Sequence, residues 1–165
     1  MEYDIIDLLF LEHKKHLDDI EDIQTLFKTA RETLKEKALD ILKEKIKDIC
    51  YELTVHFKEE EEGLFPFLYE KIGDKDGLIK TLLGEHREIE NLCKSINLYI
   101  TQIKEGQNKW SELRNSINEF LHHLNDHILK ENFYLLKLAA ENLDKDTLIK
   151  GYKIAETIRE EHGLD

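Results

Sequence analysis

A pattern of metal-binding residue types occurs twice along this chain. In each copy one histidine is followed, about forty residues later, by a His-x-x-x-Glu pair. The two copies consist of His13, His56 and Glu60, and of His86, His127 and Glu131. A histidine and a glutamate four residues apart lie on the same face of an α-helix. The chain therefore predicts helices that direct four imidazoles and two carboxylates inward, a set of ligands typical of a site for two metal ions.

The composition favours long helices. Charged residues, mostly Lys and Glu, make up 36% of the chain, with only one Pro and seven Gly. Clear breaks occur at 73–77 and 106–108, with softer boundaries at 29–33 and 142–146. The predicted helical segments are 4–30, 35–72, 76–105 and 109–141, followed by a shorter helix over 145–161.

Each long segment carries apolar residues at alternating spacings of three and four, as helices that pack in a bundle do. The seam of the third runs through Ile79, Leu82, Ile89 and Ile96 and is interrupted by His86. We therefore expect an all-α protein: an antiparallel up-down-up-down four-helix bundle over 1–141, with a short C-terminal helix in 142–165 packed on it. In this topology the six pattern residues lie at one level, roughly 14–18 Å from the same end.

The net charge and the hydropathy of the chain exclude some classes of binding partner. A net charge of −12 argues against nucleic acid and anionic membrane surfaces. The acidic start lacks the basic region of a signal peptide, and no apolar run is long enough to span a membrane. We expect a cytoplasmic protein, and the sequence leaves open whether it is a monomer or a homo-oligomer.

The segment His56-Phe-Lys-Glu-Glu-Glu-Glu-Gly-Leu-Phe-Pro66 resembles the second-helix signature of hemerythrin-like (HHE cation-binding) domains, in which Leu-Phe-Pro follows His-x-x-x-Glu. Glu12-His13, Glu85-His86 and the segment 126–132 resemble the ligand motifs of the other three helices. The resemblance covers residues 5–140. It implies a four-helix bundle that holds two non-haem irons, bridged by oxo or hydroxo. In this reading His13, His56, His86 and His127 are terminal ligands, and Glu60 and Glu131 bridge the irons.

The chain also departs from the family's oxygen carriers. Glu90 stands where they have a second histidine on the third helix, and Phe133-Tyr134-Leu135-Leu136 replaces a second Leu-Phe-Pro. The related iron–sulfur repair proteins carry a cysteine-bearing N-terminal domain, which we do not expect here. These differences weaken a simple oxygen-carrier function.

For several other residues, an ordinary structural interpretation stands beside a functional one. His16, His123 and Glu90 are supplementary candidate ligands or neighbours of the ligands. His122 and His162 are expected in solvent, and of the acidic run 59–62 only Glu60 is expected to point inward. Cys50 and Cys93, lacking a CxxC motif, are expected to be small core residues rather than a disulfide.

The favoured function is therefore a diiron protein that binds dioxygen or a related small oxidant, peroxide or nitric oxide, for sensing, transport or detoxification. Three alternatives stay open: iron storage or delivery, iron-centre repair, and peroxide or nitric-oxide reductase activity, so whether the protein is an enzyme is undecided. Zinc or manganese also suit these ligands. A ferritin-like oxidase is disfavoured, because Glu119-x-x-His122 is the sole Glu-x-x-His match with that spacing and its histidine faces outward.

Overall fold

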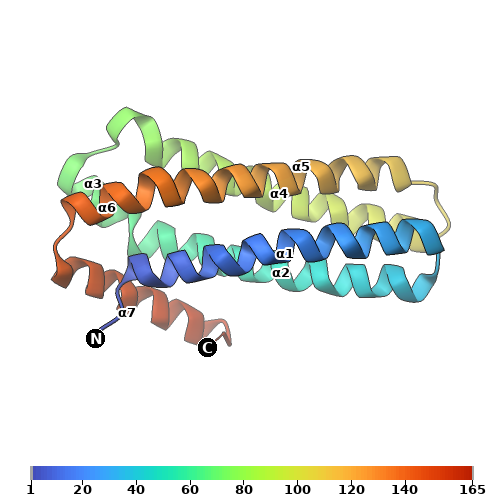
Figure 1. The fold of residues 1–165 in the computed structure, drawn as a ribbon, viewed down its shortest axis with the longest axis horizontal. Helices are drawn as coiled ribbons and strands as arrows, with labels where there is room; N and C mark the ends of the chain where they lie inside the picture. Colours follow the sequence, from blue (N-terminus) through green and yellow to red (C-terminus); the bar gives the residue numbers. More distant parts are fainter. Residues whose placement is uncertain (1, 165) are drawn as a thin grey trace.

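The chain folds into a bundle of long helices. A computed structural model describes residues 2–164, which are helical or loop throughout, with no β-strand in that range. The helices are α1 (Ile5–Thr33), α2 (Glu36–Gly63), α3 (Phe65–Ile72), the 3-10 turn η1 (Lys75–Gly77), α4 (Leu78–Lys104), α5 (Trp110–Lys130), the π-helical turn η2 (Glu131–Leu135), α6 (Leu136–Asn142) and α7 (Lys145–Glu161). The long helices α1, α2, α4 and α5 run in alternating directions, and α7 packs at a slant along α1 and α2 in one half of the bundle (Figure 1). The predicted all-α antiparallel bundle is confirmed.

The chain starts α1 and turns into α2 through local signals. Asp4 caps α1: its carboxylate accepts hydrogen bonds from the backbone N–H groups of Ile6 and Asp7, and Asp7 returns one to Asp4. The helix ends at Leu34, whose φ of 54° is left-handed and turns the chain sharply into α2.

A break interrupts the predicted segment 35–72. Leu64, with φ −128° and ψ −54°, separates α2 from α3, and Pro66 stands in the first turn of α3. Proline lacks an N–H and disfavours the helical conformation in the residue before it, so a helix cannot run through this point undisturbed. The break turns Phe65 and Leu68 into the core, where both are buried.

The predicted segment 109–141 is also not one regular helix. The π-helical turn Glu131–Leu135 inserts an extra residue into it. The buried seam is displaced accordingly: beyond Leu135 it continues through Leu136 and Ala139, whereas Leu138, three residues after Leu135, is only partly buried. The irregular turn begins at a pattern residue, Glu131.

Helix α7 packs closely against α2 because both helices carry glycine at the crossing. A Cβ atom on Gly151 would lie 2.3 Å from the carbonyl oxygen of Gly63, and one on Gly63 would lie 2.9 Å from that of Gly151. Such distances exclude any side chain there without movement of the backbone. The close approach brings Arg159, two turns further along α7, over the face formed by α1 and α2.

The buried apolar side chains form two clusters. One contains Ile23, Leu53, Phe57, Ile89 and Leu124, among others. The other, at the end of the bundle covered by α7, includes Leu9, Leu64, Leu82, Leu135 and Ala155. Members of the two clusters flank His13 on α1 and His86 on α4, and they flank Glu60 and Glu131 in the other two long segments. The core is therefore apolar above and below one polar layer.

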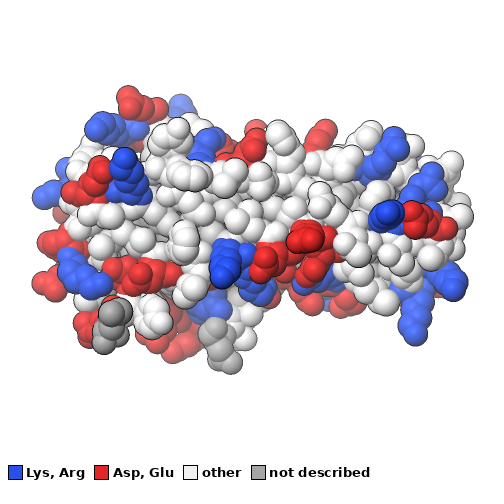
Figure 2. All heavy atoms as spheres, in the orientation of Figure 1, with Lys and Arg blue, Asp and Glu red and all other residues white. Residues whose placement is uncertain are grey.

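The surface offers no continuous basic area on the face drawn in Figure 2, where acidic and basic side chains alternate around broad uncharged stretches. Among residues 2–164, no helix has the length and apolar character needed to cross a membrane.

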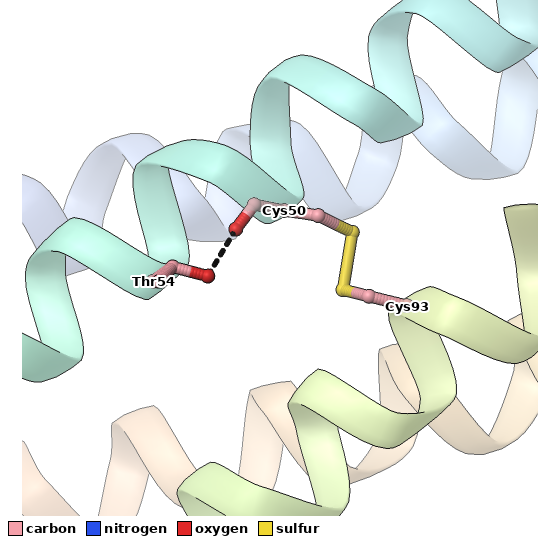
Figure 3. The surroundings of a disulfide bond; sticks show 3 residues. All are labelled: Cys50, Thr54 and Cys93. Carbon is pink, nitrogen blue, oxygen red and sulfur yellow. Dashed lines mark hydrogen bonds between the residues drawn. A yellow bond between two sulfur atoms is a disulfide. The ribbon is translucent and has the colours of Figure 1, made fainter.

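Cys50 and Cys93 form a disulfide, so the expectation of two unlinked core residues is wrong (Figure 3). The two cysteines face each other from α2 and α4, with their Cα atoms 6.1 Å apart. They are 43 residues apart in sequence, and their pairing depends on the packing of α2 on α4. The spacing of apolar residues within each helix does not show that positions 50 and 93 coincide in height.

We predict that the disulfide contributes measurably to stability. Replacing both cysteines by serine should lower the free energy of unfolding by about 2–4 kcal/mol under oxidising conditions, because the cross-link restricts the unfolded chain. Denaturant unfolding of the variant and the wild type measures the difference. The same loss should appear in wild-type protein treated with reductant, and equal stability in all three samples would contradict the prediction.

Candidate metal centre

The six pattern residues meet in the polar layer of the core. The side chains come from α1, α2, α4 and the end of α5, and each residue is at most 2% exposed. They are His13, His56, Glu60, His86, His127 and Glu131. Burial of this many ionisable groups is costly unless they neutralise one another or bind a metal ion.

The first half of the layer is formed by α1 and α2. The Nε2 atom of His13 lies 3.0 Å from Nε2 of His56, 3.3 Å from Oε1 of Glu60 and 3.4 Å from Oε1 of Glu131. His56 Nε2 is in turn 3.0 Å from Glu60 Oε1. Two imidazole nitrogens and two carboxylate oxygens thus face one point.

The second half is formed by α4 and α5. His86 Nε2 lies 3.1 Å from Glu60 Oε2, and His127 Nε2 lies 2.9 Å from Glu131 Oε1. The two oxygens of Glu60 therefore face different halves of the layer. In each half, ligand atoms from two histidines and both glutamates lie within 4.8 Å of one another, so the two clusters share Glu60 and Glu131. This geometry is consistent with a site for two adjacent metal ions.

Several atoms at the centre of the layer have no hydrogen-bond partner among residues 2–164. They are Oε2 of Glu60, Nε2 of His86, Nε2 of His127 and both carboxylate oxygens of Glu131. Buried polar atoms are rarely left without a partner. Atoms that crowd together without hydrogen-bonding geometry are what a bound cation would satisfy, so these residues fit a pair of metal ions.

The outward ring nitrogens of the four histidines are each held by an oxygen atom. His127 Nδ1 donates to Glu85 (2.8 Å) and His86 Nδ1 to Glu61 (3.3 Å). The other two pairs are His56 with Glu12 (3.4 Å) and His13 with the amide oxygen of Asn132 (2.6 Å). Because a carboxylate only accepts, Nδ1 carries the proton and the Nε2 lone pair of a neutral ring faces the centre.

These contacts follow the sequence repeat. Glu12 and Glu85, which precede the lone histidines, hold the histidine of the His-x-x-x-Glu pair in their own copy. Glu61 and Asn132, which follow the inner glutamates, hold the lone histidine of the other copy. The two copies therefore orient each other's ligands.

In each glutamate that contacts a histidine Nδ1, the second carboxylate oxygen is contacted by an arginine or lysine side chain. Arg159 of α7 contacts Glu12 at 2.5 Å, Arg87 contacts Glu61, and Lys130 contacts Glu85. These charge-assisted contacts fix the carboxylates, and through them the ring planes. Helix α7 thus takes part in positioning His56, although it carries no ligand.

Two phenylalanines close the layer around His86. The ring of Phe57 stacks on the imidazole with centroids 4.0 Å apart, and that of Phe65 lies 5.9 Å away in a nearly parallel plane. The break at Leu64 and Pro66 places Phe65 there. The Leu-Phe-Pro segment thus has a local function: it covers His86 and excludes water from it.

The metal-free layer is strongly polarised. Burial alone would lower the pKa of His127, but the charge and hydrogen bond of Glu131 and the contact with Glu85 raise it to about 9. Burial would raise the pKa of Glu60, but the surrounding histidines hold it well below its usual value. Burial would also raise the pKa of Glu85, but the hydrogen bonds and charges of His127 and Lys130 lower that pKa to about 2. Without metal, therefore, imidazolium and carboxylate groups compensate one another.

The supplementary candidates lie elsewhere. His123 is 45% exposed in its side chain and faces Glu88 at 3.9 Å, and Glu90 pairs with Arg87 at 3.3 Å. Neither is within the two clusters. His16 is buried beside His56, with ring centroids 5.1 Å apart, but belongs to a different group of residues. His122 is exposed, as expected, whereas His162 is partly buried against the end of α7.

The expectation that only Glu60 of the acidic run 59–62 points inward is wrong, because Glu59 is buried as well. It is fully buried, and Arg159 approaches it to 3.4 Å. Burial, together with a hydrogen bond shared with Glu12, raises the pKa of Glu59 to about 9. The reason is α7, which covers a face of α2 that would be wet in a bare four-helix bundle.

A comparison with known families decides the assignment. The model of the hemerythrin HHE cation-binding domain matches residues 4–139. The chain belongs to this family. The buried His/Glu layer is accordingly the cation-binding site of a hemerythrin-like domain.

Curated relatives include the "iron-sulfur cluster repair protein YtfE" of Salmonella paratyphi B, Salmonella newport and Salmonella heidelberg. Each is 32% identical over 92 residues, which cover 53% of this chain and 42% of the relative. The match thus spans less than half the length of these relatives.

Sequence reasoning missed the residues that orient the histidines. In the sequence, Glu12 and Glu85 stand out only as parts of Glu-His motifs, and neither Glu61 nor Asn132 belongs to the ligand pattern. A usable signal was present, since a polar residue precedes each lone histidine and follows each inner glutamate in both copies.

We predict that metal binding by this hemerythrin-like site releases protons. Since the pKa of His127 is about 9 in the metal-free form, this ring is protonated at pH 7 and must lose a proton before Nε2 can bind a cation. Apparent affinity should rise with pH up to about 9, by about tenfold per pH unit for each proton displaced. Calorimetric titration in buffers of different ionisation enthalpy counts these protons, and a pH-independent affinity would contradict the prediction.

We also predict that Glu85 matters without being a ligand. Glu85→Gln should lower metal affinity about 10- to 100-fold, because it weakens the hold on His127, while the number of ions at saturation stays the same. The control is Glu88→Gln on the same helix, an exposed glutamate that faces the exposed His123 at 3.9 Å. Competition with a chromophoric chelator measures both, and equal affinities would show that the Glu85 contact is irrelevant.

Proposed function

We propose that this protein holds two non-haem iron ions between Glu60 and Glu131 and binds a small oxidant there: dioxygen, peroxide or nitric oxide. Sensing, transport and detoxification of such an oxidant all require the same centre. The observation that carries the proposal is the pair of buried clusters that share both glutamates. Membership of a cation-binding family supports it.

The ligand set favours iron among the cations that would fit. Imidazole and carboxylate together suit iron, and iron changes oxidation state reversibly, as a reaction with a small oxidant requires. Bound iron would supply electrons to, and accept them from, a small oxidant.

The chain's own residues would shape that chemistry. Glu12, Glu61, Glu85 and Asn132 fix the four rings so that their Nε2 atoms face the centre. In each half, two imidazoles and two shared carboxylates provide four protein ligands, which leaves positions for an exogenous molecule on an ion that prefers six. Glu90 pairs with Arg87 at 3.3 Å and lies outside both clusters. This arrangement suits a centre open to more than one small oxidant.

Iron delivery for cluster repair is the second candidate. The observation in its favour is the 32% identity to proteins named for iron–sulfur cluster repair. Under this proposal the same six residues hold iron that is given up to a damaged cluster. The relatives are longer than the matched region, so a partner domain or protein would be required.

The two functions predict different outcomes for the diferrous protein. Mixed anaerobically with substoichiometric peroxide or nitric oxide, a binding protein changes its absorption spectrum and keeps its iron. A delivery protein loses iron to a weak chelator or to apo-ferredoxin at a rate that increases after exposure to oxidant. A protein that binds iron but does neither would contradict both functions.

The variant Glu60→Ala tests whether a glutamate shared by both clusters holds the iron. We predict that it loses most of its bound iron, since one residue serves both clusters, while the helical circular dichroism signal is largely retained. His123→Ala, which removes an exposed histidine, is the control and should keep both ions. Unchanged iron content in Glu60→Ala would rule out a bridging glutamate.

A further inference from the structure

A third group of potential ligands lies beside the dimetal layer, between α1 and α2. His16 and Asp19 are one turn apart on α1, and Glu52 projects from α2. Their ligand atoms all lie within 4.8 Å of one another. None of the three belongs to the two clusters that share Glu60 and Glu131.

His16 is the observation that points to a ligand. The residue is 2% exposed, yet neither ring nitrogen has a hydrogen-bond partner among residues 2–164. Its Nδ1 atom lies 3.7 Å from Oδ2 of Asp19, which is too long for a hydrogen bond. A neutral imidazole needs an acceptor for its proton and a donor or cation for its lone pair. Burial without either is unfavourable, and a cation bound between His16 and Asp19 would relieve it.

From this geometry we infer a third cation site, formed by His16, Asp19 and Glu52, for a divalent metal ion such as Fe²⁺ or Zn²⁺. One imidazole and two carboxylates suit such ions and would balance their double charge. In a tetrahedral site, metal–ligand bonds of about 2.0–2.2 Å place the ligand atoms about 3.3–3.6 Å apart, so a contraction of at most about 1.5 Å brings the group to that geometry. A water molecule completes a tetrahedral set.

Two lysines hold the carboxylates when no ion is bound. Lys45 lies 3.1 Å from Asp19, and Lys15 contacts both Asp19 (3.5 Å) and Glu52. Their side chains are 32% and 55% exposed, so both amines can move into water without being buried elsewhere. An arriving cation replaces the lysine charge at Asp19 and uses the ring nitrogen of His16, to which neither lysine donates a hydrogen bond.

The site connects the surface with the proposed centre. Exposure of the side chain falls from 30% at Glu52 to 5% at Asp19 and 3% at His16. Beyond His16 lies His56, with ring centroids 5.1 Å apart. A cation held here is separated from the dimetal layer by little more than one histidine ring.

The test counts zinc ions on the metal-free protein by native mass spectrometry as zinc is added. Wild type should saturate at three ions. His16→Leu, which keeps the volume of the side chain, and Asp19→Asn should each saturate at two. The control His123→Leu removes an exposed histidine and should keep three ions.

A second pair of variants separates this site from the dimetal centre. Glu60→Gln should lose ions from the centre, and Glu60→Gln combined with His16→Leu should bind one ion fewer than Glu60→Gln alone. If Glu60→Gln keeps every ion, the dimetal proposal fails while the third site stands. The third site is overturned if wild type saturates at two, or if His16→Leu and Asp19→Asn both keep three. It is also overturned if His16→Leu loses an ion and Asp19→Asn does not, because His16 would then serve the dimetal centre.

Lys45→Ala tests the competition directly. Removing a partly exposed ion pair should tighten binding of the third ion by up to about fivefold. A purely structural cluster would gain nothing from the loss of this lysine. Weaker binding of the third ion in this variant would overturn the proposal.

Discussion

The fold depends on how one polar layer is kept in the middle of an apolar core. Four imidazoles and two carboxylates are removed from water there, which is unfavourable for each group alone. Opposite charges within the layer compensate in the metal-free protein, as the raised pKa of His127 and the lowered pKa of Glu60 indicate. The same groups, once the histidines are deprotonated, have the geometry of a site for two adjacent cations. Stability and metal binding therefore use one set of atoms, with protons and metal ions as alternative occupants.

From this layer outward, each histidine contacts a side-chain oxygen, and most of these oxygen-bearing side chains contact an arginine or lysine. Each inner histidine is held by an oxygen of a neighbouring side chain, and the three carboxylates among these neighbours are held by Arg87, Lys130 or Arg159. The last of these comes from α7, whose close approach to α2 requires glycine at 63 and 151. A helix outside the four-helix bundle thus reaches a metal ligand through two side chains. His16 departs from this order, since it is buried beside the layer but lacks a partner of its own.

The long helices and the six residues of the polar layer could be predicted from the sequence. The 3-4 spacing of apolar residues defined the long helices to within a few positions, because side chains on one helical face must share an environment. The doubled His…His-x-x-x-Glu pattern identified the six inner residues for the same reason. Features that depend on the distance between separate helices were not accessible. The cysteines pair only because α2 and α4 bring positions 50 and 93 to the same height, and Glu59 is buried only because α7 covers it. The π-helical turn at Glu131 has no clear signal in the apolar spacing.

The central claim is that Glu60 and Glu131 hold two metal ions side by side. Anomalous diffraction from crystals of the protein loaded anaerobically with Fe²⁺ tests it most directly, because it locates iron independently of the protein atoms. We expect two iron peaks about 3.5–4 Å apart between the two glutamates, one near His13 and His56 and the other near His86 and His127. A single peak in this layer, or iron found only outside it, would contradict a shared two-metal site.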